Sequence, residues 1–139
     1  MYSNLLRTEC SIFPNVLPKL KTLSGRIRMA VVTSSRREHV EIAHARNGLF
    51  GFFEFILAWG DYQYSKPHPE PYQRALKRLQ LSADRCVVIE DSERGLASAL
   101  AAGLRCAVVP NQLTQNCTFQ GATAILPNLA AVPDFVAGL

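Results

Sequence analysis

The sequence of 139 residues lacks several patterns that would place it in a specialised class of protein. Its four cysteines form no Cys-x-x-Cys pair, and no histidine stands at the spacing of a zinc finger. No run of Lys or Arg exceeds two residues, so the net charge of +4 favours anionic ligands in general over nucleic acid. No apolar stretch is long enough to cross a membrane, and the N-terminus lacks the layout of a signal peptide. We therefore expect a cytoplasmic protein with neither a nucleic-acid nor a membrane partner.

The composition is that of an ordinary globular domain, with 48% apolar and 19% charged residues. Apolar runs rich in Val and Ile alternate with amphipathic stretches, and no linker or internal repeat separates them. The resulting prediction is a regular alternation of elements, with a helix at 14–25, a strand at 29–32, a helix at 36–47, a strand at 52–60, a helix at 69–81, a strand at 85–91, a helix at 92–104, a strand at 106–110, and a short strand and final helix within 123–139.

The character of these strands indicates the fold class. Strands that are apolar on both faces and joined by short crossovers form parallel sheets covered by helices on both sides. We predict one α/β domain over residues 1–139, a Rossmann-like three-layer α/β/α fold with a mostly parallel sheet. Ligands of such sheets bind beyond the carboxyl ends of the strands. Three polar groups are expected there: Thr33-Ser34-Ser35, the loop that carries Lys66, and Glu90-Asp91-Ser92.

The hydroxyl residues after the first of these strands have two interpretations. A hydroxyl such as that of Thr33 or Ser34, together with the amides of a helix N-terminus, can bind a phosphate group. Alternatively, Ser35 caps the following helix and Glu38, three residues later, completes a capping box. The local sequence leaves both interpretations open.

The charged groups also have alternative interpretations. Lys66 lies in the loop "SKPHPEPY", where a lysine is either solvated or neutralises a phosphoryl group. Glu90 and Asp91 end an apolar strand, and two adjacent carboxylates repel each other unless a cation offsets their charge. Mg²⁺ suits such a pair, because it prefers one or two carboxylates together with waters and phosphate oxygens. The alternative is that Asp91 or Ser92 caps the next helix.

Taken together and in this order, the motifs resemble those of the haloacid-dehalogenase-like hydrolase superfamily, in particular its phosphoglycolate phosphatase and β-phosphoglucomutase branch. "VVTSS", "SKPHPEPY" and "VVIEDSERGLASALAAG" are similar to the second, third and fourth motifs of that superfamily. The resemblance implies Mg²⁺-dependent phosphate monoester hydrolysis or phosphoryl transfer on a small phosphorylated metabolite. It further implies phosphate binding by Thr33, Ser34 and Lys66, a catalytic role for Lys66, and Mg²⁺ binding by Glu90 and Asp91.

One motif of the resembled superfamily has no counterpart in this sequence. Its Asp-x-Asp nucleophile motif is absent, and the only acidic residue before Thr33 is Glu9. The strand that carries this motif lies between the strands that end at Thr33 and Glu90. We therefore expect a truncated, incomplete core that is inactive in isolation, and that forms a homo-oligomer or needs a complementing segment. Residues 1–13 are interpreted as a linker or as the remnant of the cap found in this branch.

Two alternatives belong to other functional classes. In the first alternative, the chain is a non-catalytic relative that binds phosphate or a partner protein. The missing nucleophile favours this alternative. A response-regulator-like domain that accepts a phosphoryl group is disfavoured, because it needs an acidic pocket at the ends of early strands. The strand that ends at Thr33 carries none.

Overall fold

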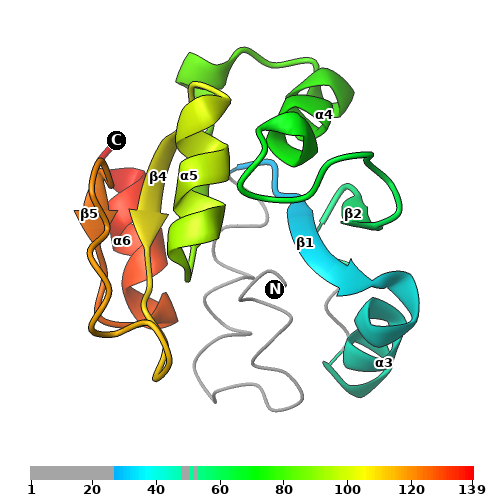
Figure 1. The fold of residues 1–139 in the computed structure, drawn as a ribbon, viewed down its shortest axis with the longest axis horizontal. Helices are drawn as coiled ribbons and strands as arrows, with labels where there is room; N and C mark the ends of the chain where they lie inside the picture. The colour runs from blue at the N-terminus through cyan, green and yellow to red at the C-terminus, as the bar shows by residue number, and fades with distance from the viewer. Residues whose placement is uncertain (1–26, 48–50, 52) are drawn as a thin grey trace. The chain divides into compact units, whose positions relative to one another are not determined.

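A computed structural model describes residues 27–47, 51 and 53–139 of the chain (Figure 1). The helix predicted at 14–25 and the cap remnant or linker predicted at 1–13 lie outside the described residues. The chain divides into two compact units. The first unit ends at Asp61 and also includes Pro133–Leu139, and the second unit is Tyr62–Val132. The prediction of a single domain stays a prediction.

The first unit contains a parallel pair of strands. β1 (Val31–Arg36) pairs with β2 (Ile56–Trp59), and Val31 lies opposite Ile56 in the register. The side chains of Val31 and Val32 in β1 and of the first three residues of β2 are buried, whereas Trp59 at the end of β2 is exposed. α3 (Arg37–Asn47) follows β1, and α6 (Val132–Ala137) runs into the C-terminal segment.

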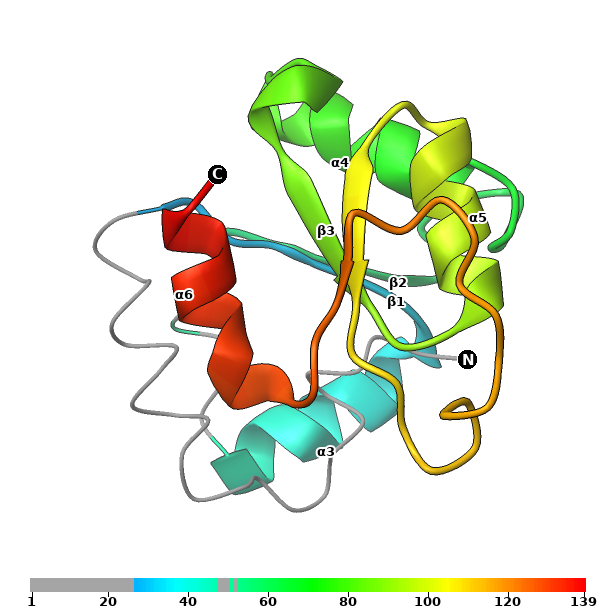
Figure 2. The ribbon, with the colours of Figure 1, turned by 90° about the vertical axis from the view of Figure 1, so that its left-hand side faces the viewer.

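The second unit contains a three-stranded parallel sheet. Its strands are β3 (Val87–Glu90), β4 (Arg105–Val108) and β5 (Ala124–Ile125), in the order β3-β4-β5. Its helices are α4 (Glu70–Leu79) and α5 (Glu93–Ala101), with short 3₁₀ turns at Ala83–Arg85 and Leu129–Ala131. α5 packs against β3, β4 and α4, as Figures 1 and 2 show. This packing buries the inner face of each helix and leaves the loops beyond β3 and β4 beside the start of α5.

The helices form where the sequence predicts them, for identifiable reasons. Tyr72 and Ala75 lie on the predicted apolar face of α4 and are buried. α5 ends just before Gly103, whose φ of 81° is a left-handed conformation that favours glycine after a helix. The predicted parallel α/β character is confirmed, since every strand pair among the described residues is parallel.

The described strands form two separate sheets. β1, which contains Thr33, and β3, which ends at Glu90, belong to different sheets. Among the described strands, β3 is therefore the last strand on its side of the second sheet. What completes that side stays a prediction.

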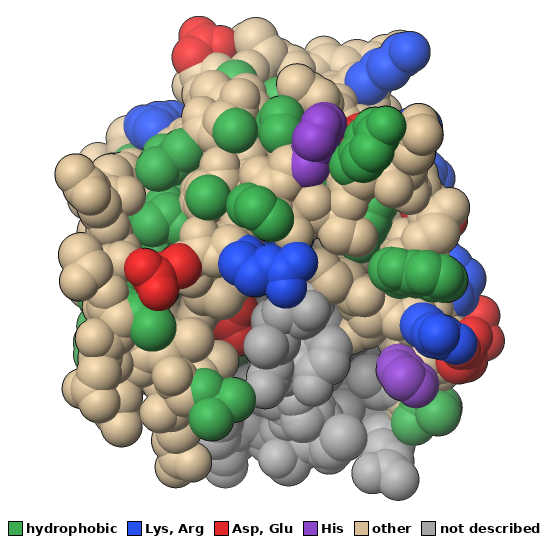
Figure 3. Space-filling model, viewed as in Figure 1, with side chains coloured by type: hydrophobic (Ala, Val, Ile, Leu, Met, Phe, Trp, Pro, Cys, Tyr) green, Lys and Arg blue, Asp and Glu red, His purple; other side chains and the backbone are tan. Residues whose placement is uncertain are grey.

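The described surface is mixed in character. In Figure 3 the Lys and Arg side chains form separate small groups, which agrees with the scattered charges of the sequence. None of the helices that the structure describes has the length and apolar character needed to cross a membrane.

Candidate functional site

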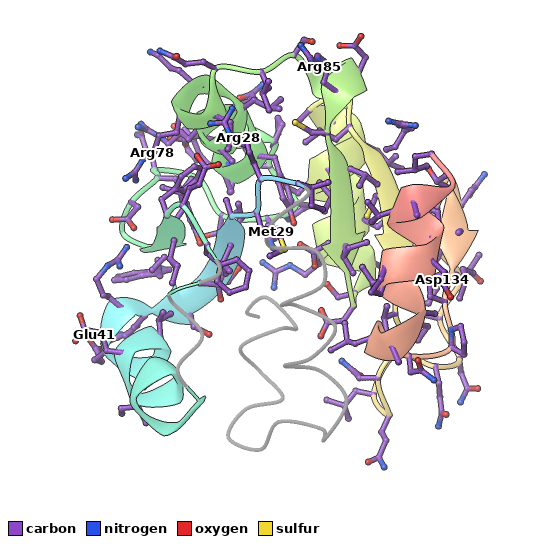
Figure 4. The ribbon with its side chains drawn as sticks, turned by 180° about the vertical axis from the view of Figure 1, so that it is seen from behind. Arg28, Met29, Glu41, Arg78, Arg85 and Asp134 are labelled. Carbon is purple, nitrogen blue, oxygen red and sulfur yellow. The ribbon has the colours of Figure 1, made fainter. Side chains whose placement is uncertain are left out.

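The second unit holds three charged side chains that are buried. Lys66, Glu90 and Asp91 expose only 5%, 2% and 1% of their surface. Burial of charge is costly unless each group has a partner, so these residues indicate a built site. The other charged side chains whose burial the structure describes reach solvent. Three of them are labelled in Figure 4, namely Glu41 on α3, Arg85 in the first 3₁₀ turn and Asp134 on α6.

Lys66 and Glu90 form a buried ion pair. The Nζ atom of Lys66 contacts Oε2 of Glu90, and the hydroxyl of Tyr72 donates a hydrogen bond to the same oxygen. The Lys66 ammonium also lies over the Tyr72 ring, 5.0 Å from its centroid. Burial, followed by the negative charge of Glu90, raises the pKa of Tyr72 well above its ordinary value. Tyr72 therefore stays protonated and acts as a hydrogen-bond donor at neutral pH.

Gly95, in the first turn of α5, makes room for the Glu90 side chain. A Cβ atom at this position would overlap the Glu90 carboxyl group, with Oε2 only 2.6 Å away. The amide of Gly95 donates a 3.1 Å hydrogen bond to Oγ of Ser92, which is the N-cap of α5. Of the two residues considered as a cap for this helix, the structure assigns the role to Ser92. Asp91 is not the cap.

Asp91 is held by the loop after β4. Nδ2 of Asn111 donates a 3.0 Å hydrogen bond to Oδ2 of Asp91, and Oγ1 of Thr114 donates a 2.8 Å bond to the Asp91 backbone oxygen. Oδ1 of Asn111 in turn accepts from the amides of Leu113 and Thr114. Sequence reasoning missed Asn111 and Thr114. The signal that could have identified them is the polar sequence that follows the buried strand β4. This sequence lies at the same carboxyl edge of the sheet as Asp91.

The loop that carries Lys66 is fixed by side chains from both helices of the unit. Nη2 of Arg94 donates a 2.6 Å hydrogen bond to the Lys66 carbonyl, and Oγ of Ser98 donates a 2.7 Å bond to the His68 carbonyl. Glu70 accepts hydrogen bonds from the amides of Gln63 and Tyr64. The interpretation of Lys66 as a solvated loop lysine is therefore wrong.

The ionised Glu70 side chain makes the stability of this loop depend on pH. The hydrogen bond from the Gln63 amide, followed by that from Arg74, lowers the pKa of Glu70 from 4.5 to about 2. A lowered pKa contributes stability above pH 4.5 that is lost as the pH falls toward 2. Glu70→Gln should remove this contribution, so its urea midpoint should fall less steeply between these pH values than that of the wild-type chain. Parallel curves for the two chains would contradict the assignment.

The carboxylates of Glu90 and Asp91 meet only some of the needs of a magnesium ion. The described residues include no cluster of three or more His, Cys, Asp or Glu side chains. Mg²⁺ does not need one, because waters and phosphate oxygens usually complete its shell around one or two carboxylates. Asp91, at a strand end, suits this role. Oε2 of Glu90 already receives two donors, which leaves Asp91 the better suited of the two acids, and both metal assignments stay predictions.

Thr33 and Ser34 belong to the first unit. Thr33 is fully buried, and its Oγ1 accepts a 3.1 Å hydrogen bond from the amide of Ser35. Ser35 itself lies within β1, and α3 begins two residues later at Arg37, which disfavours Ser35 as the helix cap. The phosphate-binding roles of Thr33 and Ser34 stay predictions.

Comparison with known proteins gives consistent matches in sequence. A family model described as "Haloacid dehalogenase-like hydrolase" matches residues 1–109. Protein CbbY of Rhodobacter capsulatus is 39% identical over 127 residues, which cover 88% of this chain and 56% of that protein. Pyrophosphatase PpaX of Bacillus pumilus is 37% identical over 107 residues, covering 76% of this chain and 48% of that protein. The chain thus spans about half the length of these relatives.

Solved structures agree with this result. CbbY from Rhodobacter sphaeroides in complex with phosphate superposes with a TM-score of 0.81 at 31% identity, over 92% of this chain and 59% of that chain. A mutant of the same protein, in complex with xylulose-1,5-bisphosphate, gives a TM-score of 0.78 at 33% identity, over 84% of this chain and 54% of that chain. These matches confirm the predicted Rossmann-like parallel α/β fold.

Proposed function

Because the chain belongs to the haloacid dehalogenase-like hydrolase family, we propose that it supplies most of a Mg²⁺-dependent site acting on phosphate monoesters. The reaction is hydrolysis or phosphoryl transfer, and the substrate is a small phosphorylated metabolite. The observation that carries this proposal is the buried Lys66–Glu90 pair beside Asp91 at the carboxyl end of β3. The names of the relatives support it, since one is a pyrophosphatase and another binds a sugar bisphosphate.

Each residue of the proposed site has a distinct chemical task. Lys66 offsets the negative charge of the phosphoryl oxygens, which lowers their repulsion toward an anionic nucleophile. Glu90 keeps the ammonium of Lys66 in place through the buried ion pair. Asp91, oriented by Asn111, holds the metal. For Thr33 and Ser34, which belong to the first unit, the family resemblance implies phosphate binding. Mg²⁺, when bound, neutralises charge on the transferring group.

The nucleophile has to come from outside the 139 residues. Family members attack phosphorus with an aspartate from an Asp-x-Asp motif, and this sequence contains no such motif. We propose that the chain is inactive in isolation and gains activity when a second segment or a second chain supplies that strand. A position beside β3 suits such a strand, because β3 is the last described strand on its side of the sheet.

The test is hydrolysis of p-nitrophenyl phosphate by the 139-residue chain, with Mg²⁺ and with EDTA. The chain is assayed alone and after co-expression with the Asp-x-Asp-bearing part of a CbbY relative. We expect turnover only in the co-expressed sample with Mg²⁺, and its loss in Lys66→Ala and Asp91→Ala. Turnover that survives both substitutions would contradict the proposed site. Turnover by the chain alone would contradict the proposed need for a second segment.

A non-catalytic role is the second candidate, and the missing Asp-x-Asp motif favours it. In that case the chain binds phosphate or a partner protein and performs no chemistry. Binding of Mg²⁺ and inorganic phosphate without turnover, even after co-expression, would support this role over catalysis.

A further inference from the structure

We propose that Tyr72 is a positioning residue for Lys66 and acts on it through Glu90. This inference rests on the proposed function, because Lys66 is the residue that would face the phosphoryl group. All three side chains belong to the second unit and are buried. Tyr72 stands in the first turn of α4, which begins four residues after Lys66. The turn between them brings the two side chains back to the same carboxylate.

One oxygen atom carries the coupling between the two residues. Oε2 of Glu90 accepts hydrogen bonds from both the Lys66 ammonium and the Tyr72 hydroxyl. A carboxylate bound by a single lysine can rotate about its side-chain torsions, whereas a second donor from another element removes that freedom. The ring of Tyr72 also lies under the Lys66 ammonium, with 5.0 Å between Nζ and the centroid. Tyr72 therefore constrains Lys66 directly with its ring and indirectly with its hydroxyl.

The rest of the surroundings makes this constraint effective. Gly95 leaves space for the carboxyl group of Glu90 at the start of α5, and any side chain at that position would occupy it. A buried hydroxyl is costly unless it forms a hydrogen bond, so a tyrosine that served only to fill space would be better replaced by phenylalanine. The hydroxyl of Tyr72 has its hydrogen bond with Glu90. These observations assign the hydroxyl to the ion pair rather than to packing.

The experiment measures how fast the Lys66 amine is acylated in the intact 139-residue chain. Short pulses of acetic anhydride, followed by mass spectrometry of the Lys66 peptide, compare the wild-type chain with Tyr72→Phe. The exposed Lys77 serves as an internal reference. Tyr72→Phe removes the hydrogen bond from the Tyr72 hydroxyl to the Glu90 carboxylate, which leaves Lys66 less firmly held. Acylation of Lys66 should therefore be about tenfold faster in this variant. An unchanged Lys66 rate relative to Lys77 would overturn the inference.

A control separates positioning from general loosening of the fold. Leu104→Val removes one methylene from a buried side chain of the same unit, and Leu104 is none of the three coupled residues. It should lower stability by an amount similar to or larger than Tyr72→Phe, yet leave the Lys66 rate near that of the wild-type chain. If Leu104→Val accelerates Lys66 labelling as much as Tyr72→Phe does, the effect is merely structural and the inference fails.

Inorganic phosphate in the same experiment distinguishes this inference from the proposed function. If phosphate slows acylation of Lys66 in the wild-type chain and Tyr72→Phe accelerates it, both are supported. If Tyr72→Phe accelerates labelling but phosphate gives no protection, the positioning role stands and phosphate binding by Lys66 fails. If Tyr72→Phe has no effect, the positioning role is overturned whatever phosphate does.

Discussion

Replacing Gly95 with alanine is expected to lower the free energy of unfolding by about 3 kcal/mol, because overpacking and displacement of a buried ion pair act together. Inside an exposed helix the same substitution stabilises a protein, by roughly 1 kcal/mol. Here the added methyl group would fall on the carboxyl group of Glu90. The side chain of Glu90 has to move, and Lys66 and Tyr72 then lose their common partner.

Urea unfolding of the two chains measures this effect. Gly51→Ala is the matched control, since Gly51 is exposed and a Cβ atom there would meet nothing within 4 Å. The control should change stability by no more than about 0.5 kcal/mol. Equal stability of Gly95→Ala and the wild-type chain would show that Glu90 does not occupy the described position.

Lys66→Met is expected to cost about 3–5 kcal/mol, because it leaves the buried carboxylate of Glu90 without its countercharge. The double variant Lys66→Met, Glu90→Gln should recover most of this loss. A neutral amide needs no countercharge, and its oxygen still accepts the hydrogen bond from Tyr72. The free energies of unfolding of the two single variants, the double variant and the wild-type chain give the coupling energy of the pair.

The exposed ion pair between Arg28 and Glu54 provides the comparison. Its side chains are 50% and 40% exposed, against 5% and 2% for Lys66 and Glu90. Arg28→Met should therefore cost only about 0–1 kcal/mol. Equal costs for Arg28→Met and Lys66→Met would contradict the burial of the Lys66–Glu90 pair. Failure of the double variant to recover stability would contradict the direct contact between the two residues.

The elements of the fold could be read from sequence because their signals are local. The Val-rich runs before Thr33 and Glu90 became β1 and β3, and the amphipathic stretch with Tyr72 and Ala75 became α4. Gly103 ends α5 as predicted. The expectation that a strand is missing from the sheet stays a prediction.

The sequence predicted which residues belong to the candidate site, but not which residues they contact. Sequence motifs pointed to Lys66, Glu90 and Asp91, and all three are buried in the second unit. Nothing local distinguished a solvated Lys66 from a buried one, because its burial depends on α5 supplying Arg94 and Ser98 to the loop. Asn111 was missed for the same reason, since β4 places it beside Asp91, 20 positions away in sequence.

The order of strands and helices, the place of Glu90 and Asp91 at the end of a strand and the absence of an Asp-x-Asp nucleophile follow from the sequence alone, because each depends on neighbouring residues. Thr33, Ser34 and Ser35 were expected beyond the end of a strand, but they lie within β1. The tertiary structure decided which of two adjacent acids takes which partner. Glu90 points to Lys66 and Tyr72, whereas Asp91 meets Asn111. Glu90 is the last residue of β3 and Asp91 follows the strand, and packing alone brings Lys66, Tyr72 and Asn111 to these two acids.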